Sequence, residues 1–278
     1  MTGLPEASAA GELAPALMAG LLASLACGVV GSLVLVRRAS SVAGGLSHAA
    51  LGGVGLAWFV GLSPLAGALG FAVLCGAVLA EAEHRKLAGF DTLVSMTWAG
   101  GMALGVLLLS LAPEQHGELE EYLFGSVSLA SGAHLWLLAA LDAVVLGVVW
   151  WRFAPLRAMA FDVEFARASG LPVRLMRHML MALTALAVVA VVRVVGIVLA
   201  IALLTVPAAT ARRRTDDLAR MMLLATVLCA VITCGGLVLS VQLSQLLRVD
   251  LPDGPVVVML SLLVHGLERL LPGSRSGR

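Results

Sequence analysis

The sequence has little charge and few aromatic residues for a chain of 278 residues. Asp, Glu, Lys and Arg make up 13% of it and Phe, Trp and Tyr 5%, whereas 60% of the residues are hydrophobic. Soluble proteins carry roughly 25% charged residues, so this chain has too few charges to cover a compact water-soluble surface. An ordinary soluble enzyme is therefore excluded, and the surplus apolar surface must face lipid.

Other absences exclude particular activities. The formal net charge is only +1 and no basic run is interleaved with aromatic residues, which argues against nucleic-acid binding. The four cysteines form no CxxC pair and lie in apolar stretches, so neither a disulfide framework nor a thiolate metal site is expected. The sequence contains no GxxxxGK[ST] motif for ATP and no HExxH motif of a zinc hydrolase. We therefore expect that the chain is not an enzyme and that it binds no cofactor itself.

What the sequence does contain is a series of apolar stretches close to the length of about twenty residues that a membrane-spanning helix needs. Several are short or joined by tight turns, so the expected number of spans is eight, nine or ten. Thirty glycines allow such helices to approach closely. The prediction is an all-α polytopic transmembrane helix bundle, with residues 1–278 forming a single domain. The approximate spans are 13–36, 42–60, 65–81, 92–112, 133–152, 177–192, 194–211, 218–240 and 255–271.

The basic residues orient these spans, because Lys and Arg near span ends stay on the cytoplasmic side. With nine alternating spans, sixteen of the eighteen basic residues fall on one side, the exceptions being Arg193 and Arg248. This arrangement predicts a cytoplasmic C-terminus and an extracytoplasmic N-terminus. The opposite side carries an acidic loop, which could attract a divalent cation at an outer mouth or simply be a solvated acidic face. Its candidate residues are His116, Glu118, Glu120 and Glu121.

A short helix is predicted between Phe161 and Gly170, on the cytoplasmic side. Asp162 can cap it, Glu164 lies in its first turn, and Gly170 followed by Pro172 ends it. A rigid element at the inner face of the membrane can enter a groove on a soluble partner. The alternative is an interfacial helix with no partner.

Two further residues are unusual within apolar spans. Pro207 lies one turn from the cytoplasmic end of the span 194–211, where it frees a backbone carbonyl and is expected to kink the helix. His48 is an ionisable residue in the span 42–60, which by default is a functional hypothesis. The alternative for His48 is a packed residue that donates a hydrogen bond to a backbone carbonyl.

Taken in order, five motifs make the sequence similar, over nearly its whole length, to the membrane permease subunit of zinc/manganese/iron importers of the ATP-binding-cassette (ABC) class. The most specific is Leu-Leu-x-x-Pro-Ala-Ala-Thr-Ala over residues 203–211. The other four are Leu46-Ser47-His48-Ala49 after a double arginine, Tyr122-Leu123-Phe124-Gly125, Phe161-Asp162 with Glu164-Phe165-Ala166 and Gly170, and Asp250-Leu251-Pro252-Asp253-Gly254-Pro255.

The resemblance implies a type II-like importer permease in the bacterial cytoplasmic membrane. It implies a homodimer with the translocation path at its interface, with Pro207 as a kink or gating residue. Two cytoplasmic ATPase subunits would use the ATP and dock on a coupling loop over 156–176, and an extracytoplasmic solute-binding protein would deliver the metal. The coupling residues would be Phe161, Asp162, Glu164, Ala166 and Gly170.

The family motif has an aspartate where this sequence has Gly44, four residues before His48. An imidazole without a neighbouring carboxylate is a softer ligand environment, which favours zinc over manganese. We therefore expect transport of Zn²⁺, with His48 in the path. Alternatives are a manganese or iron importer of the same family, a metal-chelate permease, and a secondary cation transporter that works without an ATPase. Secondary transporters usually have paired broken helices in two repeated halves, and the sequence shows no such repeat.

Overall fold

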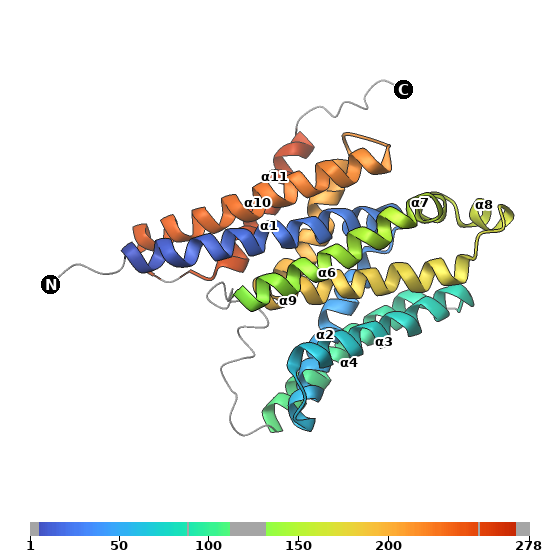
Figure 1. Cartoon of the computed structure of the whole chain (residues 1–278), viewed down its shortest axis with the longest axis horizontal. Coiled ribbons are helices and arrows are strands. Elements are labelled where there is room, and N and C mark those ends of the chain that lie inside the picture. The colour runs from blue at the N-terminus through green and yellow to red at the C-terminus, as the bar shows by residue number, and fades with distance from the viewer. Residues whose placement is uncertain (1–5, 88, 112–131, 250, 271–278) are drawn as a thin grey trace.

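The computed structural model describes residues 6–87, 89–111, 132–249 and 251–270, and within these ranges the chain is helical without strands (Figure 1). The predicted all-α bundle is therefore confirmed. The helices are α1 (Glu6–Val36), α2 (Ser40–Val60), α3 (Pro64–His84), α4 (Phe90–Leu111), α6 (Gly132–Trp151), α7 (Phe153–Phe161), α8 (Val163–Ala168), α9 (Val173–Arg212), α10 (Leu218–Leu247) and α11 (Asp253–Leu270).

Each predicted apolar stretch falls on one of these helices, but fewer of them qualify as spans. In the described part of the chain, six helices are long and apolar enough to cross a membrane, or seven if α6 and α7, bent by 77°, count as one. Two predicted spans fall short for different reasons. The second part of α9, Gly196–Arg212, is too short, and α11 carries Asp253, Glu268 and Arg269 within its 18 residues.

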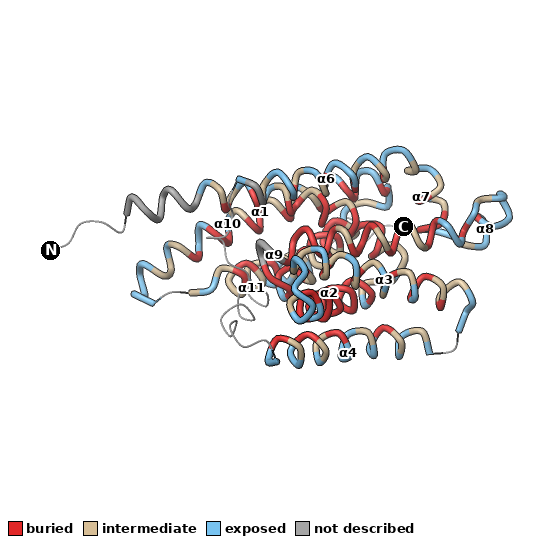
Figure 2. The backbone as a smooth tube through the Cα atoms, turned by 60° about the horizontal axis from the view of Figure 1, so that its bottom comes forward, coloured by how far each residue is buried: buried red, intermediate tan, exposed pale blue. Residues whose placement is uncertain are grey.

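α2 is the most enclosed of the six candidate spans, with 83% of its apolar window buried. It packs against α3, α4 and α9, and Figure 2 shows it in the interior with α4 outside it. In Figure 1, α2, α3 and α4 form one group, and α1, α6, α10 and α11 form another, with α9 in contact with both. α2 is therefore surrounded mainly by protein, whereas α4 has a broad lipid-facing side.

Glycine allows α2 and α4 to approach backbone to backbone. A Cβ added at Gly101 of α4 would lie 2.6 Å from the Cα of Ala49 and 2.9 Å from the carbonyl oxygen of His48. The same contact recurs one turn later, where a Cβ at Gly105 would lie 2.7 Å from the carbonyl oxygen of Leu51. A side chain at Gly101 or Gly105 would force the two helices apart.

Gly101→Ala is therefore expected to destabilise the protein by about 1–3 kcal/mol, the usual cost of overpacking. Gly100→Ala is the matched control, because a Cβ at Gly100 meets nothing within 4 Å and alanine is the better helix former. The measurement is the thermal unfolding midpoint of each purified variant in detergent. Equal midpoints for the two variants would contradict the close approach of α2 and α4.

Candidate functional site

The predicted short helix is present as α8, with the predicted cap and terminator. The Asp162 Oδ1 atom accepts hydrogen bonds from the backbone N–H groups of Glu164 (2.9 Å) and Phe165 (3.0 Å). Gly170 has a φ of +74°, the left-handed conformation in which glycine commonly follows a helix end. These local interactions fix the orientation of α8 relative to α7 and α9.

α8 projects from one end of the bundle (Figure 1). Phe165 is 61% exposed and Phe161 is also exposed, whereas Ala166 is fully buried on the inward side of the helix. Exposed aromatic side chains on a small projecting helix are suited to enter a groove on a partner.

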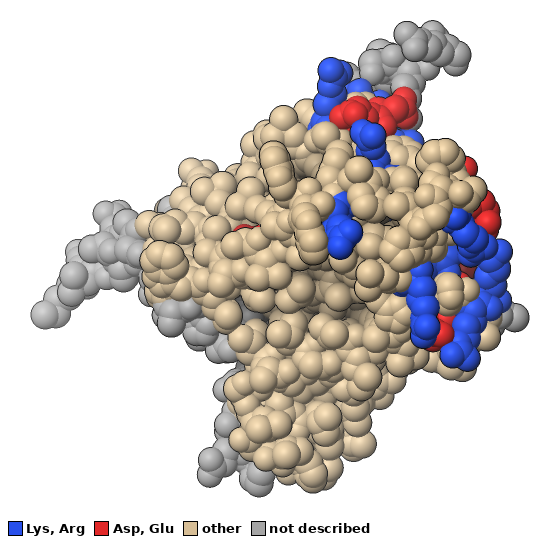
Figure 3. All heavy atoms as spheres, turned by 45° about the vertical axis from the view of Figure 1, so that its right-hand side comes forward, with Lys and Arg blue, Asp and Glu red and all other residues tan. Residues whose placement is uncertain are grey.

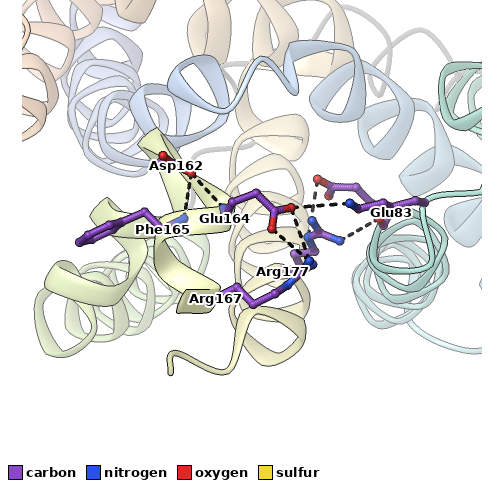
Figure 4. A network of polar contacts seen from close by, with 7 residues as sticks. Glu83, Asp162, Glu164, Phe165, Arg167 and Arg177 are labelled. Carbon is purple, nitrogen blue, oxygen red and sulfur yellow. Dashed lines mark hydrogen bonds and ion pairs between the residues drawn. The ribbon is translucent and has the colours of Figure 1, made fainter. Parts of the chain in front are cut away.

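An ion pair links α8 to the turn that follows α3, and further pairs join the spans behind it (Figure 4). Glu164 pairs with Lys86, which follows α3, at 3.6 Å, and with Arg167 of α8 itself at 3.2 Å. On α3, the carboxylate of Glu83 pairs with Arg37 at the end of α1. The exposed pairs on Glu164 contribute little to stability, but the pair with Lys86 shows that α8 lies beside the turn that follows α3.

The buried part of this network joins three helices. Arg177 of α9 donates a hydrogen bond through Nη1 to the backbone oxygen of Glu83 (2.8 Å), and its Nε lies 3.8 Å from the Glu83 carboxylate. The side chains of Arg37 and Arg177 are only 6% and 5% exposed. Burial lowers the pKa of Arg37, while the Glu83 carboxylate acts in the opposite direction. Removing one member of such a buried network leaves an uncompensated charge, so α1, α3 and α9 are firmly held together at this end.

His48 lies on α2 at the contact with α4 and is 7% exposed. Its ring stacks on that of Trp98, with centroids 4.8 Å apart and an interplanar angle of 12°. The buried Nδ1 atom has no hydrogen-bond partner among the residues that the structure describes. The ring is thus positioned by stacking, and the carbonyl acceptor expected for a purely packed histidine is not seen within that part of the chain.

Gly44 lies one turn before His48 on the same helix. It is buried, yet a Cβ added there would meet nothing within 4 Å. The position at which the family motif has a carboxylate therefore has room for a side chain that this sequence lacks. Among the described residues no three His, Cys, Asp or Glu side chains are grouped so that they could hold a metal ion, so His48 has no ligand set within them.

Pro207 does not mark the break in α9. The backbone leaves helical geometry at Gly196, with φ 80° and ψ 166°, a conformation that is essentially restricted to glycine. At Pro207 the helix continues, and the Leu203 carbonyl that the proline leaves without its helical donor lies 4.0 Å from the Sγ atom of Cys229 on α10. The break at Gly196 lies three residues from the boundary predicted between the spans 177–192 and 194–211, and the role of Pro207 stays a separate prediction.

The outer loop with His116, Glu118, Glu120 and Glu121 lies outside the described residues, as does the Tyr122–Gly125 motif. The candidate site that the structure does describe has two parts. One is the capped helix α8 with its ion-pair network, and the other is His48 with Trp98 between α2 and α4.

Comparison with known proteins identifies the family. The model of the ABC 3 transport family matches residues 11–267. The chain belongs to this family. The chain is also 30% identical, over 229 residues, to the manganese import system permease protein ScaB of Streptococcus parasanguinis. This match covers 82% of this chain and 81% of the relative. An uncharacterized membrane protein of Synechocystis sp. is 34% identical over 251 residues, covering 90% and 87% of the two chains.

The fold of this ABC 3 permease also matches a solved structure, PsaBC from Streptococcus pneumoniae in complex with Fab. The TM-score is 0.83 at 26% identity, and the match covers 95% of this chain and 92% of the other. The resemblance drawn from the motifs is therefore confirmed: the chain is a membrane permease of an ABC metal importer. In this class ATP hydrolysis belongs to a separate subunit.

Sequence reasoning missed two features of the ABC 3 permease. It did not predict the Arg37–Glu83–Arg177 network, although the placement of Arg37 and Arg177 on one side of the membrane was a signal for it. It also did not predict the stacking of Trp98 on His48, for which the sequence gives no signal.

Proposed function

We propose that this permease imports a divalent transition metal as a homodimer, driven by two copies of a cytoplasmic ABC ATPase. The observation that carries the proposal is α8, a capped helix with an exposed Phe165 that projects from the bundle. An ion pair links it to Lys86, three residues after Glu83, where ion pairs join α1, α3 and α9. Closure of the ATPases on ATP would move α8, and the spans joined at Glu83 would follow. An extracytoplasmic solute-binding protein would deliver the metal at the other end.

The end that carries α8 is assigned to the cytoplasm. On the face shown in Figure 3, Lys and Arg gather along one end and one edge of the molecule, and the rest of that face is nearly free of charge. At this end Glu83 pairs with Arg37 and Arg177, and Glu164 of α8 pairs with Lys86. Arg212 lines the same cleft as Arg37. Positive residues favour the cytoplasmic side. The assignment places the N-terminus outside and the C-terminus inside.

For the transported ion the proposal is Zn²⁺, with His48 as a weak ligand in the path. The support is an imidazole whose Nδ1 has no partner among the described residues, with a glycine at position 44, where the family motif has a carboxylate. This is a softer environment than manganese prefers. Manganese is the second candidate, because the Streptococcus parasanguinis relative is named as a manganese import permease. A weak site suits transport, since a complete ligand cage would retain the ion.

The ion assignment predicts that zinc is taken up in preference to manganese and iron. The permease would be reconstituted in liposomes with its ATPase and binding protein, and Zn²⁺, Mn²⁺ and Fe²⁺ would be supplied together at equal concentration with ATP. The measurement is metal content of the vesicles by elemental analysis. Preferential accumulation of manganese would overturn the zinc assignment and establish the second candidate, while leaving the importer mechanism intact.

A further inference from the structure

A cleft of about 480 Å³ opens beside the coupling helix. Its walls come from the end of α1, the last residues of α7, the first residue of α8 and the end of α9. Six of its nine lining residues are apolar, among them Met159 and Phe161, and the other three are Arg37, Arg38 and Arg212. Phe161 is one of the predicted coupling residues and Arg37 belongs to the Glu83 network, but the transport mechanism above assigns no ligand to the cleft itself.

The charge of the cleft is positive, with no acidic residue in its lining. Arg37 already forms an ion pair with Glu83. Arg212 pairs with Asp216 at 3.5 Å and lies over the ring of Phe161 at 5.6 Å. Arg38 is exposed and forms no ion pair with any residue in the described ranges. The cleft therefore presents at least one guanidinium group available to an anion.

The cleft also lies at a particular depth in the membrane. The first span ends at Val36, so the apolar residues Leu35 and Val36 and the charged residues Arg37 and Arg38 meet where hydrocarbon gives way to lipid headgroups. A ligand that fits must combine an anionic group with an apolar part. Basic pockets between transmembrane helices on the cytoplasmic side bind the phosphate groups of anionic lipids in this way, and guanidinium groups suit phosphate particularly well.

We propose that this cleft binds the phosphate headgroup of an anionic phospholipid, with Arg38 as its main contact and the apolar wall against the start of the acyl chains. The proposal is independent of which ion is transported. It places a lipid directly against α7 and the start of α8.

Arg38 offers an unusually clean test, because its backbone is in the left-handed region with φ 57°. Its N–H donates to the Leu35 carbonyl (2.9 Å), and the next N–H, of Ala39, donates to Val34 (2.9 Å), which closes the end of α1. Glycine is the favoured residue at such a position, so Arg38→Gly removes the charge without straining the fold. Arg248→Gly is the matched control, since Arg248 also ends a helix, has a φ of 56° and is exposed, but lies outside the cleft lining.

The experiment is native mass spectrometry of the purified full-length chain mixed with phosphatidylglycerol, phosphatidylcholine or inorganic phosphate. We expect the wild-type protein and Arg248→Gly to retain phosphatidylglycerol well above phosphatidylcholine. Loss of one charge-assisted hydrogen bond should lower that retention about tenfold in Arg38→Gly. Arg38→Gln, which keeps the length of the side chain without its charge, should behave in the same way.

Three results would overturn the proposal. Equal retention by Arg38→Gly and the wild-type protein would show that the cleft is not the lipid site. Retention of inorganic phosphate as strong as that of phosphatidylglycerol would make it a site for free anions. Loss of ATPase binding by Arg38→Gly with no change in phosphatidylglycerol retention would assign the cleft to the ATPase interface.

Discussion

Phe165→Ala is expected to reduce ATP-driven metal uptake at least tenfold while leaving the permease folded. Phe165 is 61% exposed on α8, so removing its ring costs the isolated permease almost nothing. In the proposed complex the ring is buried against the ATPase, where a phenyl group contributes about 1.5–3 kcal/mol, equivalent to at least tenfold in affinity. The measurements are co-purification of the ATPase with the tagged permease and metal uptake by proteoliposomes.

Phe59→Ala provides the control for this variant. Phe59 is the same residue type with a similar exposure, 58%, but it lies near the far end of α2, away from α8. It should leave ATPase co-purification unchanged. If Phe165→Ala also bound the ATPase at wild-type strength, α8 would be an interfacial helix without a partner.

His48→Phe is expected to abolish most metal uptake, again by more than about tenfold, without loss of folded protein. Phenylalanine can keep the stack on Trp98 and fills a similar volume, but it lacks both ring nitrogens, and a ligand that contributes 1.4 kcal/mol already corresponds to tenfold. Uptake would be measured together with the thermal midpoint, because the ring is 7% exposed and packing changes there would lower the midpoint.

The complementary variant is Trp98→Phe, which keeps an aromatic partner for the imidazole and leaves both of its nitrogens in place. It should transport at close to the wild-type rate. Normal uptake by His48→Phe would instead make His48 a packing residue, and the metal path would have to be sought elsewhere on the permease.

The spans and the coupling helix could be predicted because their signals are local. Apolar runs between turn residues located every long helix, and Asp162 and Gly170 located the ends of α8 within a residue or two. The number of spans was less predictable, because a helix such as α11 is apolar on average but carries charges at both ends. The break in α9 was predicted between the spans 177–192 and 194–211, three residues before Gly196. Gly196 itself could not be singled out, since a glycine interrupts a helix only when its φ is positive, which the sequence does not reveal.

The parts of the site that were not predicted depend on residues far apart in the chain. Arg37 and Glu83 are 46 positions apart, and Arg177 is 94 positions from Glu83. Which basic residue on the cytoplasmic side meets which carboxylate is decided by how α1, α3 and α9 pack, and a single sequence carries no record of that packing. The roles of His48, Pro207 and the outer acidic loop remain predictions, and the loop lies outside the described residues.

The measurement that tests the central claim most directly is metal uptake by liposomes containing the permease with and without its ATPase subunit. The account predicts uptake only when the ATPase, ATP and Mg²⁺ are all present, and none when the permease alone is given an ion or proton gradient. Gradient-driven accumulation of metal by the permease alone would contradict an ATP-driven importer and show that the chain works as a secondary cation transporter.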